Sequence, residues 1–297
     1  MAVNYNDPFL RDEITFVEKT HQYFNKDNEE YKSVSRMLNG LKVPFDSARM
    51  SGLMAGKYAA ENGISVDQAQ KEILSSWETN KDESIDKGNY VHDSLERYAI
   101  KGTCDEEMQE ACNFLRIILK EHYRYYPETI VHSHRYKIAG TTDNAMIRQK
   151  SKSPVVDFYD YKSNKSKGIQ YDSIKRTDEL KHYNRFLLPP FDYLEDCNYT
   201  IYSLQLSLYA FMAVDSNPDI RIGRLGIIFV DNEFKPSLIP VPFMYQEAKT
   251  ICELNLTRKT LPEHEVINVS PESKIIDGTK ADPSINNELK LTYSEDW

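Results

Sequence analysis

The sequence has few cysteines, and they are widely spaced. Four occur among the 297 residues, Cys104, Cys112, Cys197 and Cys252, and no CxxC motif is present. Zinc sites and iron–sulfur clusters usually draw on closely spaced cysteines, so the sequence indicates neither. Such sparse cysteine usage fits a reducing, intracellular setting, and we expect a cytoplasmic protein.

Long apolar runs are also missing. No run approaches the roughly 18 residues that a membrane-spanning helix requires. The opening stretch, MAVNYNDPFLRDEITF, lacks the basic segment followed by an apolar segment that is typical of a signal peptide. We therefore expect a chain without a secretion signal and without a membrane partner.

Positive charge is in the minority. Lys and Arg total 37 against 46 Asp and Glu, which gives a formal net charge of −9. This balance argues against unspecific coating of nucleic acid, which favours basic surfaces, but it is compatible with a local basic groove. Part of the acidity can instead reflect carboxylates that gather around a metal ion.

What the chain does have is 40% hydrophobic residues, enough for one large or two modest domains. Strand-like pieces at 14–25 precede amphipathic segments and, later, β-branched and aromatic runs. Helices are predicted at 33–41, 46–63, 65–80, 84–100, 105–126, 197–215 and 245–260, and strands at 129–136, 138–148, 155–163, 221–231 and 237–242. This order predicts an α/β core with a helical N-terminal half, followed by a polar, loosely packed tail.

Two apolar strands carry aspartates where a carboxylate is costly to bury. Asp143 follows the bend in IAGTTD, and Asp160 ends the run VVDFYD, two residues before Lys162. Neighbouring strands could bring both aspartates to one end of a sheet, as an oxygen-rich site for Mg²⁺ or Mn²⁺. Lys162 would share the face of Asp160, because side chains alternate along a strand. A metal beside a lysine suits phosphodiester hydrolysis; the simpler alternative is two turn or edge aspartates and a solvated lysine.

Several pieces in a fixed order resemble the PD-(D/E)xK nuclease superfamily, in its RecB-like exonuclease branch. They are KGNYVHDSLERY, PETIVHSHRYKIAGTTD, DYK and YSLQLSLY, and the resemblance runs from about residue 14 to about residue 231. The ITF opening and the FD…W…G..H..LE order are similar to phage exonucleases and the mitochondrial genome-maintenance exonuclease. The resemblance implies a restriction-endonuclease-like fold, with a central mixed β-sheet flanked by helices. It divides the chain into a helical region at 1–84, a nuclease core at 85–261 and a polar tail at 262–297.

The same resemblance implies a site for Mg²⁺ or Mn²⁺. The metal ligands would be His92, Asp143, Asp160 and the carbonyl oxygen of Tyr161. Lys162 would be the catalytic lysine, and Glu128 would be a catalytic acidic residue close to the metals or their waters. Taken alone, a helix histidine such as His92 is more often a structural residue whose ring nitrogens are satisfied.

Two further segments would hold the substrate. Gln205 and Tyr209 match the QxxxY helix of the family, and Tyr202 shares their stripe at i, i+3 and i+7, although such tyrosines are also common at the edge of a core. The loop after DYK carries polar and basic residues that could track phosphates, unless it is an ordinary solvated loop. These loop residues are Asn164, Lys165 and Lys167.

The sequence departs from the family pattern at two points. Thr142 stands where many members have a proline before the first aspartate. Several RecB-like relatives carry a four-cysteine iron–sulfur cluster with closely spaced ligands near the C-terminus, and Cys197 and Cys252 are too far apart for it. No iron–sulfur cluster is therefore expected.

Together these features predict a Mg²⁺- or Mn²⁺-dependent deoxyribonuclease, an exonuclease that acts on free DNA ends or single strands. Replication or recombination proteins would be its partners, and the host cytoplasm its location if it is viral, as the resemblance to phage enzymes suggests. Two alternatives stay open. One is a nucleic-acid-binding partner that keeps a nuclease fold without turnover, and the other is a restriction-type endonuclease.

Overall fold

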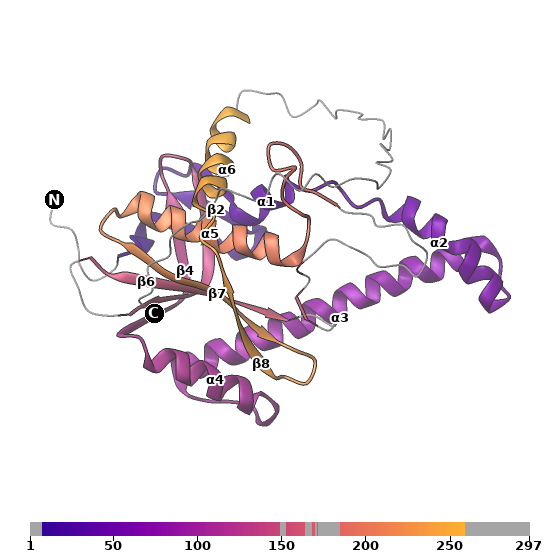
Figure 1. The fold of residues 1–297 in the computed structure, drawn as a ribbon, viewed down its shortest axis with the longest axis horizontal. Coiled ribbons are helices and arrows are strands. Elements are labelled where there is room, and N and C mark those ends of the chain that lie inside the picture. The colour runs from indigo at the N-terminus through magenta and orange to yellow at the C-terminus, as the bar shows by residue number, and fades with distance from the viewer. Residues whose placement is uncertain (1–7, 149–152, 164–167, 170, 172–184, 259–297) are drawn as a thin grey trace, which may run out of the picture. The chain divides into compact units, whose positions relative to one another are not determined.

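The protein has an α/β fold with a mixed, eight-stranded sheet flanked by helices (Figure 1). The computed structural model describes residues 8–148, 153–163, 168–169, 171 and 185–258. The α/β class is confirmed, whereas the closer likeness to restriction endonucleases and the division at residues 84 and 261 stay predictions. The tail at 262–297 lies outside the described residues.

The strands are β1 (Ile14–Val17), β2 (Gln22–Asn25), β3 (Glu30–Ser33), β4 (Arg124–Ser133), β5 (Ile138–Ile147), β6 (Val155–Ser163), β7 (Arg221–Val230) and β8 (Pro236–Val241).

Strand β5 is the branch point of the sheet. One edge of β5 pairs with β4 in antiparallel fashion along its length. The other edge is shared, because β3 pairs in parallel with Ile138 and Ala139, and β6 pairs in antiparallel fashion from Asn144 to Ile147. Among the described residues, positions 140–143 of β5 therefore have no ladder partner on this edge. Strand β6 continues beside β7 in parallel, and β7 pairs with β8 in antiparallel fashion.

The helix boundaries follow local capping signals. The helices are α1 (Val34–Asn39), α2 (Ser47–Asn62), α3 (Val66–Lys101), α4 (Gln109–Lys120), α5 (Asn198–Ser216) and α6 (Tyr245–Arg258). The Ser33 hydroxyl accepts a hydrogen bond from the Arg36 amide at the start of α1, and so satisfies one of the amides that a helix N-terminus leaves unpaired. Helix α2 ends at Gly63, which adopts φ = 67°, a conformation that glycine accepts without strain.

Two helix predictions were wrong in extent. The segments expected as separate helices at 65–80 and 84–100 form one 36-residue helix, α3, because the stretch between them contains neither glycine nor proline to break it. The helix expected at 105–126 is shorter, since α4 ends at Lys120 and β4 already begins at Arg124. Aromatic residues at 123, 125 and 126 favour a strand, and pairing with β5 outweighs the helical pattern there.

The two faces of the sheet are covered by different helices (Figure 1). Helix α5 packs on one face together with α1 and α6, and it is buried on nearly every side. The second half of α3 and α4 cover the other face. Strand β6 illustrates the alternation: Phe158 packs in the α5 cluster, whereas Tyr159 and Tyr161 pack in the cluster with α3 and α4. The first half of α3 pairs with α2 around a separate small cluster of Ala55, Ala59, Ala69 and Ile73.

No helix of the described part of the chain combines the length and the apolarity that crossing a membrane would need.

A disulfide closes the connection between α3 and α4. Cys104 and Cys112, eight positions apart, are bonded with their Cα atoms 6.5 Å apart. This pair was not predicted, because a helix at 105–126 would leave no turn to bring the two cysteines together. Cys197 and Cys252 are buried free thiols.

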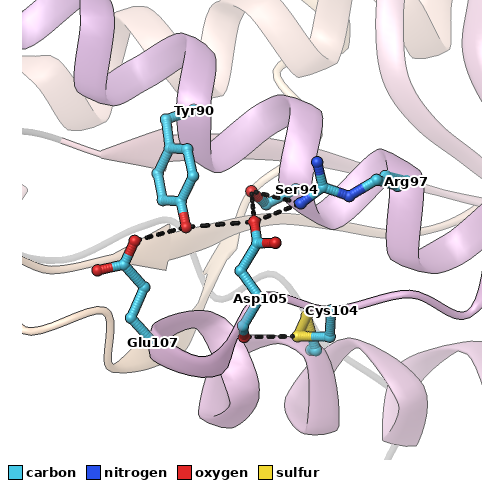
Figure 2. Close-up of a disulfide and its surroundings, with 7 residues drawn as sticks. Tyr90, Ser94, Arg97, Cys104, Asp105 and Glu107 are labelled. Carbon is cyan, nitrogen blue, oxygen red and sulfur yellow. Dashed lines mark hydrogen bonds and ion pairs between the residues drawn. A yellow bond between two sulfur atoms is a disulfide. The ribbon is translucent and has the colours of Figure 1, made fainter.

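The residue next to the disulfide ties this connection to α3 (Figure 2). Ser94 and Tyr90 each place a hydroxyl oxygen 3.3 Å from Asp105 Oδ2, and Arg97 forms an ion pair with the same oxygen. Tyr90 also donates to Glu107 Oε1 at 2.6 Å. Three successive turns of α3 are thereby held against the segment that the disulfide closes.

Reduction of this disulfide should lower stability. Cleaving the Cys104–Cys112 bond releases a short loop in the unfolded chain, and the expected loss is about 2 kcal/mol of unfolding free energy. Urea unfolding with and without a phosphine reductant measures it. The Cys104→Ser/Cys112→Ser variant should match the reduced protein and show no response to the reductant. A wild-type protein whose stability is indifferent to reductant would contradict the expectation.

Candidate active site

The unpaired stretch of β5 places a carboxylate between two separating strands. Strands β5 and β6 stop pairing beyond Asn144 and Tyr159. The Asp143 side chain takes over there, because its Oδ2 accepts a hydrogen bond of 2.6 Å from the Tyr161 amide. Asn144 reinforces the fork, donating to the Tyr159 carbonyl and accepting from the Tyr161 hydroxyl. The fork thus fixes Asp143, which is only 8% exposed, in the gap where β5 and β6 separate.

Strand β6 supplies the second aspartate and the lysine. Asp160 is buried, and its Oδ2 forms an ion pair with Lys162 Nζ. Its other oxygen accepts a hydrogen bond of 3.2 Å from Gln205 Nε2 on helix α5. The Lys162 ammonium also lies 5.0 Å from the centre of the Tyr202 ring. The structure therefore brings together the DxK pair and two residues of the predicted substrate helix.

Helix α3 contributes an imidazole to the same place. His92 Nε2 lies 2.9 Å from the Tyr161 carbonyl oxygen, and His92 Nδ1 lies 3.6 Å from Asp143 Oδ2. His92, Glu128 and Asp143 each offer a ligand atom within 4.8 Å of the other two, so this group could hold a metal ion. Four of the predicted ligands and neighbours are thus in one place: His92, Glu128, Asp143 and the Tyr161 carbonyl.

Glu128 reaches the site through a break in β4. It lies opposite Asp143 in the β4–β5 register. Its backbone has φ = 41°, a value that residues other than glycine rarely adopt. Tyr126 and Val131 pack in the same core cluster although they are five positions apart, so the alternation of faces is interrupted between them. The Thr129 hydroxyl donates to the Tyr126 carbonyl at 3.1 Å, which supports the break. Strained backbone of this kind is often found at functional sites.

The site opens into a cleft of about 490 Å³ between α3 and β4. Its lining is predominantly acidic and polar: Ile85, Gly88, Asn89, His92, Asp93, Glu96 and Glu128. Asp93 and Glu96 are not among the site residues predicted from the sequence. Both belong to the HDSLE piece, one and four residues after His92, so the signal was the spacing of acidic residues beside a candidate ligand on a helix.

The carboxylates of this cleft repel one another. Desolvation, reinforced by the charges of Asp143, Glu96, Asp160 and Asp93, raises the pKa of Glu128 to about 8. Burial and the neighbouring Asp160 raise the pKa of Asp143 to about 6, although His92 and Lys162 oppose the shift. Crowded carboxylates with raised pKa values favour a cation among them, so the electrostatics agree with the donor set.

The lysine is held in its charged form. Burial alone would favour the neutral amine, but the carboxylates of Asp160 and Asp143 outweigh it and raise the pKa of Lys162 above its usual value. An ammonium at this position is therefore present over the whole neutral range.

We expect the metal-free protein to lose stability as the pH rises. A carboxyl group whose pKa is raised by folding stabilises the protein while it is protonated, and this contribution disappears as the pH passes the folded-state value. The loss for Asp143 and Glu128 should fall between about pH 4 and pH 8. Thermal unfolding in EDTA measures this slope, and Glu128→Gln should remove its upper part. Mn²⁺ should flatten the curve, because a cation favours the ionised carboxylates. A slope that is absent in EDTA and present with Mn²⁺ would contradict this account.

The predicted substrate residues are only partly exposed. Gln205 is half-buried, and its amide lies 3.0 Å from the hydroxyl of Tyr209. Tyr209 is buried, at 5% exposure, and packs over Gly140, where a Cβ atom would come within 2.7 Å of its ring. Its position suits a residue that holds Gln205, and direct contact with a substrate stays a prediction. The loop residues Asn164, Lys165 and Lys167 lie outside the described residues.

Comparisons with known proteins identify distant structural neighbours only. No protein-family model matches the sequence, and no curated protein does. Among solved structures, the chain is similar to a "Putative exonuclease" from Eubacterium rectale, with 14% identity, a TM-score of 0.30, and coverage of 87% of this chain and 84% of that one. A second structure, SSO0001, shows 13% identity and a TM-score of 0.27, and the match covers 77% of this chain and 85% of that one.

Proposed function

We propose that the protein is a metal-dependent nuclease that hydrolyses phosphodiester bonds in DNA, acting as an exonuclease on free ends or single strands. The convergence described above carries this proposal. An imidazole from α3, acidic groups from β4, β5 and β6, and a half-buried ammonium on β6 meet where β5 and β6 separate. The proposed family is the PD-(D/E)xK superfamily, in its RecB-like branch.

The donor set fits Mg²⁺ or Mn²⁺. Carboxylate oxygens and a backbone carbonyl are the ligands that these hard cations prefer, and Mn²⁺ also accepts an imidazole. The ligands would be His92, Glu128, Asp143, Asp160 and the Tyr161 carbonyl. When bound, a divalent cation lowers the pKa of a water molecule and offsets negative charge on the phosphate in the transition state.

Lys162 supplies a second, fixed positive charge. Its ion pair with Asp160 keeps the ammonium at the fork, and its partial burial limits the screening of its charge by water. From there it can orient an attacking water and stabilise the charge that develops on phosphate oxygens. Gln205 holds Asp160 from the side of α5, and so fixes the carboxylate that pairs with the lysine.

The acidity of the cleft explains why cations would be obligatory. Asp93, Glu96 and Glu128 line the cleft, and Asp143 lies beside it. A polyanionic strand would be repelled by this surface until cations neutralise it. Substrate binding and metal binding are therefore expected to be coupled.

End-labelled DNA provides the test. Linear single-stranded, linear double-stranded and covalently closed circular DNA are incubated with the protein in Mg²⁺, in Mn²⁺ or in EDTA, beside the Asp160→Asn variant. The expected result is stepwise loss of nucleotides from linear DNA, only with a metal and only with the wild-type chain. Cutting of the circle would favour a restriction-type endonuclease. DNA binding without cleavage under any of these conditions would overturn enzymatic function in favour of a non-catalytic binding partner.

A further inference from the structure

A second cluster of metal-ligating side chains lies away from the acidic cleft. Glu13 ends the short 3₁₀ helix η1 (Arg11–Glu13), just before β1, while His132 lies near the end of β4 and His134 directly follows that strand. One ligand atom from each of the three residues lies within 4.8 Å of the others. His132 is four residues from Glu128, roughly 13 Å along the strand, so the two clusters are separate.

The buried histidine of this cluster, His132, has ring nitrogens that are not hydrogen-bonded within the described part of the chain. The His132 side chain is fully buried, and neither of its ring nitrogens has a hydrogen-bond partner of good geometry among the described residues. Its Nε2 lies 3.4 Å from Glu13 Oε2. A buried polar group without a partner destabilises a protein, so such groups usually mark a place where an ion or a water molecule binds. Burial, together with the neighbouring His134, lowers the pKa of His132 and keeps the ring neutral, which is the form that binds metals.

The other two side chains are arranged around the same point. His134 Nε2 lies 2.6 Å from Glu13 Oε2, the oxygen that also faces His132. The second ring nitrogen of His134 lies 2.6 Å from the Tyr31 hydroxyl, which orients the ring as outer partners of metal ligands commonly do. Both Glu13 and His134 are partly exposed, so they can adjust and a solvent molecule can reach the site.

We propose that Glu13, His132 and His134 form a second metal site, selective for a first-row transition cation such as Zn²⁺. Two imidazoles and one carboxylate with an open fourth position are a typical zinc donor set, unlike the oxygen-rich set of the cleft. Tetrahedral zinc places its ligand atoms about 3.3 Å apart. The His132–Glu13 distance of 3.4 Å already agrees with this, whereas the hydrogen bond between Glu13 and His134 must widen as the cation replaces its proton.

The cation would link the N-terminal hairpin, formed by β1 and β2, to the main sheet. Strand β1 pairs with β2 among the described residues, and the hairpin reaches the main sheet through the short strand β3. A cation bound by Glu13, His132 and His134 would add a direct link between the start of the hairpin and the end of β4. Binding of the cation would therefore stabilise the fold, and cleavage of DNA is not needed to detect it.

Zinc titration of the full chain tests the proposal. The cleft is first silenced with the His92→Ala/Asp143→Asn background, so that binding there is not counted. By calorimetry after chelator treatment, this background should bind about one Zn²⁺ per chain, and binding should raise its melting temperature. Adding Glu13→Gln or His134→Ala should weaken binding by roughly 100-fold or more, since loss even of an outer partner costs 10–100-fold.

The controls separate loss of a ligand from loss of structure. His134→Ala and Glu13→Gln alter partly exposed side chains, and circular dichroism should show an unchanged fold. His21→Asn removes an exposed histidine of the same hairpin at a φ of 50° that asparagine tolerates, and it should leave zinc binding intact. The proposal is overturned if the background binds no Zn²⁺, or if Glu13→Gln and His134→Ala both bind it as tightly as the background does.

Discussion

Replacing Lys162 with methionine should lower the rate of DNA cleavage by roughly 10²–10³-fold or more, the cost of removing one preorganised positive group from a transition state. Methionine keeps the length of the stem and removes only the charge. The ammonium is half-buried beside Asp160, and the charges of Asp160 and Asp143 raise its pKa and so hold it in its charged form. Single-turnover cleavage of end-labelled DNA in saturating Mn²⁺ measures the effect on chemistry rather than on binding.

Stability has to be followed in the same variant. Lys162→Met leaves Asp160 buried without its partner, so the metal-free variant should unfold more easily, and Mn²⁺ should restore much of the loss. Lys120→Met, at the exposed end of α4, is the matched control and should change neither rate nor stability. Wild-type cleavage by Lys162→Met would remove the lysine from the mechanism.

Replacing Asp143 with asparagine should abolish metal-dependent cleavage and, in EDTA, make the protein more stable. Asparagine can still accept the Tyr161 amide hydrogen bond, but it removes a charge that burial and the neighbouring Asp160 disfavour. With the pKa of Asp143 raised to about 6, the expected gain at pH 8 is about 1–3 kcal/mol of unfolding free energy. Urea unfolding with EDTA measures the gain.

Asp157 provides a matched control of opposite sign. It is equally buried, but it accepts from His122, Arg148 and Arg224 at 2.7–3.0 Å. Burial opposes its ionisation, yet these hydrogen bonds hold the pKa of Asp157 well below its usual range. Asp157→Asn should therefore destabilise the protein by about 3–5 kcal/mol. If both substitutions destabilise equally, the repulsion assigned to the cleft is wrong.

Asp157 and its strand neighbour Asp160 also show the limit of sequence-based prediction for the site. VVDFYD carries both, three residues apart, and alternation puts them on opposite faces of β6. Which one is neutralised by cationic side chains depends on α4 and β7, which are distant in sequence. The DxK spacing singled out Asp160 correctly as the partner of Lys162, but nothing in the pattern predicted that Asp157 would be more completely paired.

The fold was predictable where local signals decide it. Amphipathic segments and β-branched runs predicted α1, α2, β5, β6 and β7 to within about two residues. The β4 boundary was missed because pairing with β5 outweighed a helical pattern, and the disulfide was missed because a helix expected from residue 105 leaves no room for the turn between α3 and α4. The break at Glu128 has no sequence signature, since glycine or asparagine would be expected at such a φ.

The fork between β5 and β6 has a practical consequence. In an unbroken ladder the Tyr161 amide would donate to a backbone carbonyl, which has no charge to change. Here the amide donates to Asp143 Oδ2. The strength of this hydrogen bond therefore depends on whether the carboxylate is protonated, ionised or bound to a cation. The nitrogen-15 resonance and the hydrogen-exchange rate of this single amide are therefore an intrinsic gauge of cation occupancy, readable in solution before any nucleic acid is added.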